Sequence, residues 1–93
     1  MTPEARQFRA TDAKQLLENP LFVESFSAVR NHLTSQALSC DPDNADKALR
    51  IVISLQLLAG IEREIKRIVQ DGTIAEMQLA EIEKKNRLPQ FRR

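Results

Sequence analysis

A single histidine and a single cysteine carry the strongest nucleophilic chemistry in this chain of 93 residues. His32 and Cys40 lie eight positions apart in one predicted helix, which separates their backbones by about 12 Å along the axis. A Cys–His dyad requires roughly 3 Å between its reactive atoms, so this spacing excludes an intrachain dyad on a continuous helix. Cys40 also extends an apolar stripe and falls at a helix C-terminus, where the partial negative charge disfavours a thiolate. We predict no catalytic residue and a non-enzymatic protein.

Carboxylates are more numerous, but their spacing does not suit a metal site. The acidic residues of the last predicted helix are Glu76, Glu81 and Glu83. They do not share one helical face, and no His follows any of them at three residues, as the di-metal pattern of helical bundles requires. A second acidic group consists of Asp41, Asp43 and Asp46, and it lacks the glycine and the terminal glutamate of a calcium loop. We therefore expect no metal and no other cofactor.

Positive charge is concentrated at one end of a nearly neutral chain. The formal net charge is +1, yet five basic residues fall in the last ten positions: Lys84, Lys85, Arg87, Arg92 and Arg93. Such a segment can bind nucleic-acid phosphates without reading sequence, dock on an acidic partner, or satisfy a helix dipole. Because the first two predicted helices present no basic recognition face, we favour protein docking and keep nucleic acid as the alternative.

Composition and the N-terminal sequence indicate an intracellular protein. One cysteine cannot form an internal disulfide, and no apolar run is long enough to cross a membrane. Residues 1–9 are polar and include an acid, whereas a secretory signal needs an apolar stretch of about 7–15 residues. We expect a reducing compartment and no membrane contact.

Three prolines mark predicted helix starts. Each follows a capping residue, in the pairs Thr2-Pro3, Asn19-Pro20 and Asp41-Pro42. A proline at the first helical position lacks only an N–H that has no partner there anyway. Gly72 can end a helix, and Thr73 and Glu76 have the spacing of a capping box. These signals predict helices near 3–18, 20–40, 42–71 and 74–86.

Hydrophobic periodicity predicts how these helices pack. Residues 22–40 carry one apolar face, whereas residues 42–71 are apolar over more than half of the circumference. We predict an all-α fold in which helices 20–40 and 42–71 form an antiparallel hairpin, with flanking helices completing a small bundle. The domain is expected over 1–88, with a basic tail at 89–93.

The broad apolar surface of the 42–71 helix predicts self-association. The residues assigned to an oligomer or partner interface are Leu57, Gly60, Ile61 and Ile68. Gly60 costs about 1 kcal/mol relative to alanine in a helix interior, so it either permits close approach by a neighbour or is simply tolerated. We expect a homo-oligomer.

Residues 12–82 resemble small helical proteins encoded among the head and tail genes of tailed phages. The resemblance rests on residues 13–22, with the Asn19-Pro20 helix start, on the leucine-rich segment 55–61, and on the helix end at Asp71-Gly72. It implies a role in virion structure or assembly, in the cytoplasm of a host bacterium or in the particle, and transfers no catalytic residue. It leaves open two alternatives: a DNA-associated packaging or regulatory factor, and an accessory protein that inhibits a host protein.

Overall fold

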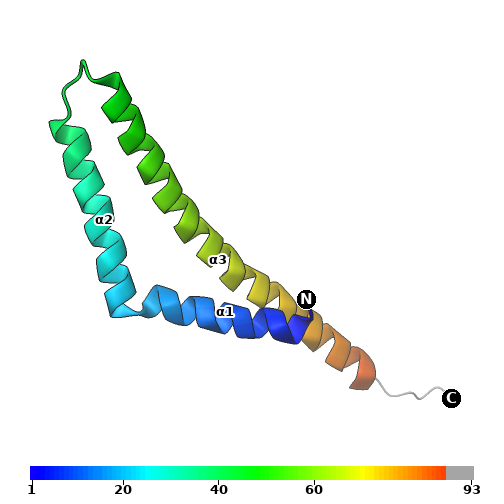
Figure 1. The fold of residues 1–93 in the computed structure, drawn as a ribbon. Coiled ribbons are helices and arrows are strands. Elements are labelled where there is room, and N and C mark those ends of the chain that lie inside the picture. The colour runs from blue at the N-terminus through cyan, green and yellow to red at the C-terminus, as the bar shows by residue number, and fades with distance from the viewer. Residues whose placement is uncertain (88–93) are drawn as a thin grey trace.

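The computed structural model describes residues 1–87, and that part of the chain folds into three helices without a strand. They are α1 (Pro3–Glu18), α2 (Pro20–Ser39) and α3 (Ala45–Arg87). Figure 1 shows α3 as the longest helix, with α2 beside its first half and α1 antiparallel to its second half. The all-α prediction is confirmed over this range, with three helices where four were predicted, whereas the predicted tail at 89–93 lies outside it.

Two of the three predicted proline starts are confirmed. The Thr2 hydroxyl oxygen accepts a hydrogen bond from the Ala5 N–H at 3.1 Å. The Asn19 carboxamide oxygen accepts from the N–H groups of Leu21 and Phe22, at 2.9 and 3.1 Å. Asn19 also ends α1, because its own N–H donates to the Leu16 carbonyl oxygen at 3.2 Å. One residue therefore joins two helices, which produces the sharp corner between α1 and α2 in Figure 1.

The predicted start at Pro42 is wrong, because α3 begins at Ala45. Asp41 uses its carboxylate to accept from the Asp43 N–H at 2.9 Å, and its carbonyl oxygen accepts from the Asn44 N–H at 2.9 Å. Pro42 therefore occupies the second position of a tight turn, where its fixed φ is equally suitable. Asn44 caps the helix instead, accepting from the Lys47 N–H at 3.1 Å.

The predicted helix end at Gly72 is also wrong. No glycine in the described residues has a positive φ, and α3 continues for 43 residues, a length of about 64 Å. The Thr73 hydroxyl donates to the Val69 carbonyl oxygen at 3.4 Å instead of capping a new helix. Gly72 is needed for packing, because a Cβ at this position would collide with the Cβ of Ala10 on α1.

Small residues bring α1 and α3 together, and the buried core is small. The buried hydrophobic side chains of the described residues are Ala13, Ile51 and Ala75. No large side chain is fully buried in this part of the chain. The radius of gyration is 21.2 Å, against about 12 Å for a compact globule of 93 residues, and the dimensions are 78 × 26 × 17 Å. The molecule is therefore extended, with a thin hydrophobic interior.

Candidate interaction surface

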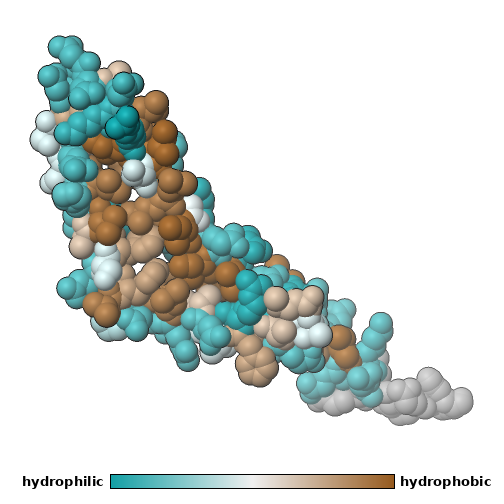
Figure 2. All heavy atoms as spheres, viewed as in Figure 1, coloured by the Kyte–Doolittle hydropathy of each residue, from teal (hydrophilic) through white to brown (hydrophobic). Residues whose placement is uncertain are grey.

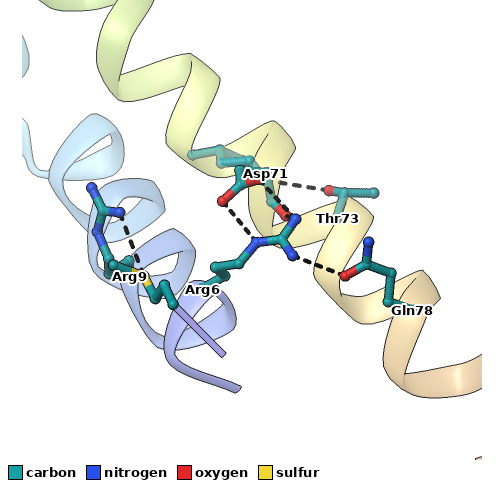
Figure 3. Close-up of polar contacts among 7 residues, drawn as sticks. Arg6, Arg9, Asp71, Thr73 and Gln78 are labelled. Atoms are coloured by element: carbon teal, nitrogen blue, oxygen red, sulfur yellow. Dashed lines mark hydrogen bonds and ion pairs between the residues drawn. The ribbon is translucent and has the colours of Figure 1, made fainter. Parts of the chain in front are cut away.

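An arginine clasp holds α1 against the second half of α3. The Arg6 guanidinium donates through Nε and Nη2 to the two carboxylate oxygens of Asp71, at 3.0 and 2.8 Å. Its Nη1 donates to the Gln78 carboxamide oxygen at 2.8 Å. Figure 3 shows Arg6 reaching from α1 toward both residues of α3. This bidentate geometry fixes the position of α1 along α3.

The clasp changes the ionisation of both partners. The hydrogen bonds from Arg6 stabilise the carboxylate of Asp71 and lower the pKa of that carboxyl below its ordinary value, although partial desolvation acts in the opposite direction. The same hydrogen bonds raise the pKa of Arg6. Both groups are therefore charged at neutral pH, where the clasp is intact.

The contact between α2 and α3 is looser. Arg30 on α2 approaches Glu62 on α3, with 3.4 Å between Nη2 and Oε2. Its guanidinium carbon lies 5.7 Å from the ring centroid of Phe26, which in turn packs against Phe22 with the two centroids 5.2 Å apart. Figure 2 shows apolar residues gathered between α2 and the first half of α3, with openings between them. These two helices leave part of their apolar surface uncovered.

Four large apolar residues form an exposed row on the first half of α3, which we name the α3 stripe. Its members are Leu49, Ile53, Leu57 and Ile61. Their spacing of four places them on neighbouring positions of one helical face. Their exposed fractions are 58%, 44%, 66% and 53%, so all four side chains are open to solvent.

The α3 stripe continues into the surface that α1 covers. Ile65 and Ile68 extend it in steps of four and three residues and are half-buried, and Gly72 and Ala75 follow in the same alternation and are buried. The same face of α3 is thus covered along its second half and open along its first. A protein surface of this kind, apolar and contiguous with a packed interface, is typical of an interaction site.

Two of the four predicted interface residues are exposed on α3, and the other two are half-buried. Leu57 and Ile61 belong to the α3 stripe, whereas Ile68 is half-buried at its boundary with the α1 contact. At Gly60 a Cβ would have one close neighbour in the described chain, the Arg63 Nη2 atom at 3.7 Å. No atom of α1 or α2 lies within 4 Å of that Cβ position, and the role of Gly60 in a contact between copies stays a prediction. Sequence reasoning missed Leu49 and Ile53, although their spacing from Leu57 was the available signal.

The remaining sequence-predicted groups lie apart from this surface. His32 is exposed on α2, and Cys40 follows the end of that helix, with Sγ 3.6 Å from the Asp41 carbonyl oxygen. Within residues 1–87 no three His, Cys, Asp or Glu side chains come together as metal ligands. Lys84 and Lys85 are exposed near the end of α3, and Arg92 and Arg93 lie outside the described residues.

Comparisons with known proteins do not assign the chain to a family. No protein-family model, curated protein or solved structure matches it. Across the described range, none of the helices combines the length and the apolar character needed to cross a bilayer. Function is therefore inferred from the geometry of the chain and from the exposed α3 stripe in particular.

Proposed function

We propose that this chain is a non-enzymatic assembly protein that acts through protein–protein contacts and self-associates through α3. The observation that supports the proposal best is the exposed α3 stripe, a row of large apolar side chains on the longest helix. Single exposed apolar residues are normal on a protein surface, whereas a contiguous row is typical of a binding face.

The surface area of the chain supports the same proposal. The accessible surface is 7305 Å², about a third more than the roughly 5,500 Å² expected of a compact monomer of 10.6 kDa. The additional exposed area exceeds the ~800 Å² that each partner contributes to a standard protein interface. Association therefore offers the chain a way to bury apolar surface that its own helices leave open.

The resemblance to proteins of phage head and tail gene clusters suggests where this assembly takes place. A thin, extended helical subunit that needs neighbours suits a role in virion structure or morphogenesis. Inhibition of a host protein would use the same apolar face with a different partner. We place virion assembly first because self-association requires no partner beyond a second copy of the chain.

The proposal is tested by measuring mass with light scattering during size exclusion. We expect the full chain to elute as an oligomer and Leu57→Glu to shift it toward monomer, because the substitution puts a charge in the middle of the α3 stripe. Leu38→Glu is the matched control, since Leu38 on α2 is 84% exposed and lies outside the stripe. A wild-type chain that stays monomeric at high concentration contradicts the proposal, as does an equal response of the two variants.

A DNA-associated role is the second candidate, because Lys84 and Lys85 are both exposed near the end of α3. Its test is binding to duplex DNA at increasing salt. Binding through phosphates weakens steeply as ionic strength rises. Replacing both lysines by glutamine reduces the slope of the logarithm of the binding constant against the logarithm of the salt concentration. Absence of binding at low salt removes this candidate without affecting the first.

A further inference from the structure

Charged residues lie at equal distances on either side of Leu57 in the α3 stripe. Arg50 precedes Leu57 by seven residues and Glu64 follows it by seven. Seven residues are close to two turns of helix, so both side chains fall near the face that carries the stripe. Both residues are exposed. The open face of α3 thus has a positive end, an apolar middle and a negative end.

We propose that two copies of the chain pair through antiparallel α3 helices, with Leu57 of each copy opposite Leu57 of the other. This inference rests on the self-association proposed above and adds its direction and register. In this arrangement a residue before Leu57 faces the residue equally far after it in the second copy. Ile53 then faces Ile61, and Arg50 faces Glu64. The contact is a two-fold symmetric one, in which the same surface is used twice.

Charge complementarity selects the antiparallel direction. A parallel pairing in register puts Arg50 against Arg50 and Glu64 against Glu64, so that like charges meet at both ends of the contact. The antiparallel pairing puts opposite charges at both ends. Within the described residues no ion pair involves Arg50, whereas Glu64 pairs with Arg67 of its own helix at 2.7 Å. Arg50 therefore enters the contact without giving up an internal ion pair.

Small residues beside the stripe permit the two helices to approach closely. The register that pairs Leu57 with itself also places Gly60 opposite Ser54 of the second copy, because each lies three residues from Leu57. No other helix within residues 1–87 fills the space beside Gly60. Small residues at a helix crossing shorten the distance between the axes and improve contact between the flanking large side chains.

A second copy is the occupant that the observations favour. In the register centred on Leu57, the segment from Ile53 to Ile61, about 12 Å of helix, faces the same segment of the second copy in reverse, and Leu49 faces the half-buried Ile65. A partner of different sequence would have to reproduce both the apolar row and the reversed charge order.

Cysteine cross-linking tests the register and the direction. In a Cys40→Ser background we expect Leu57→Cys to form an intermolecular disulfide under mild oxidation, because the two Cα atoms can approach within the required ~4.4–6.8 Å. Ile53→Cys alone should not cross-link, since its counterpart lies about 12 Å away along the helix. The double variant Ile53→Cys/Ile61→Cys should cross-link. A disulfide from Ile53→Cys alone indicates parallel pairing and overturns the proposal.

Charge reversal tests the same arrangement without a covalent bond. Arg50→Glu should weaken association about five- to tenfold, because it replaces two exposed ion pairs per dimer by two repulsions. Glu64→Arg should act in the same direction, and the double variant should restore association. In a parallel dimer the single reversals keep a like-charge pair and change little. Circular dichroism of each variant confirms that its helices remain formed.

The two proposals can fail separately. A monomeric wild-type chain contradicts the proposed self-association and with it the pairing. An oligomer in which Leu57→Cys does not cross-link and the double charge reversal does not restore association overturns only the antiparallel pairing.

Discussion

Replacing Gly72 by alanine is the sharpest test of the contact between α1 and α3. In an exposed helix interior, alanine is more favourable than glycine by about 1 kcal/mol. At Gly72 the new Cβ meets the Cβ of Ala10 and also lies 3.5 Å from its Cα, so the helices must separate. Overpacking of this kind costs about 1–3 kcal/mol. The substitution should therefore range from neutral to about 2 kcal/mol destabilising.

Gly60→Ala is the matched control, because it makes the same chemical change on the same helix. Its Cβ would lie 3.7 Å from the end of the flexible Arg63 side chain, an ordinary contact distance. In the monomer, at a protein concentration below the range of the proposed self-association, we expect it to stabilise the chain by about 1 kcal/mol. The two alanine variants should thus differ by about 1–3 kcal/mol, where each kcal/mol moves Tm by roughly 4–8 °C in a chain of this size.

Thermal unfolding followed by circular dichroism measures the difference in stability between the two variants, with both at the same low protein concentration, at which the chain is monomeric. Amide hydrogen exchange shows which helix is loosened, because only Gly72→Ala should increase exchange in α1. Ala10→Gly removes the opposing methyl, so in a double-mutant cycle its cost should be smaller in the Gly72→Ala background than in the wild type. Equal stabilisation by the two alanines, with α1 exchange unchanged, would refute the close approach of α1 at Gly72.

Two further predictions concern the clasp and the corner. Because Arg6 lowers the pKa of Asp71 in the folded chain, the stability that the pair contributes is present above the ordinary aspartate pKa of about 3.9 and is lost as pH falls below it. Urea unfolding measured as a function of pH should show this loss of stability. Asp71→Asn should make the free energy of unfolding depend less on pH in this range. Asn19→Ala removes two hydrogen bonds from the start of α2 and should destabilise the chain by about 1 kcal/mol in thermal unfolding, whereas a neutral effect would show that the corner does not depend on this cap.

Local sequence signals predicted the features that depend on neighbouring residues. Thr2 and Asn19 cap the helices that they precede, since a capping side chain reaches only two or three residues ahead. The same logic misplaced the start of α3, because Asp41 and Asn44 are both good capping residues and Asn44 lies nearer the periodic segment. Asp41 closes the turn between α2 and α3 through the N–H groups of Asp43 and Asn44, which leaves Asn44 to cap α3.

Long-range packing explains the error at Gly72. A glycine followed by Thr73 and a β-branched Ile74 has the local features of a helix end. The feature that gives Gly72 its role is Ala10, 62 positions earlier in the chain, and no local pattern links the two. The exposed stripe was predicted in part, because hydrophobic periodicity identifies an apolar face but does not tell which half of it another helix covers.

The clasp between Arg6 and Asp71 also constrains the order in which the chain can fold. The hairpin of α2 and α3 joins segments separated by a short turn, whereas the clasp joins residues 65 positions apart, so closing it requires a much larger loss of chain entropy. During synthesis α1 leaves the ribosome first and has no partner until residues 71–78 follow. We therefore expect α1 to dock last, onto a hairpin that is already formed.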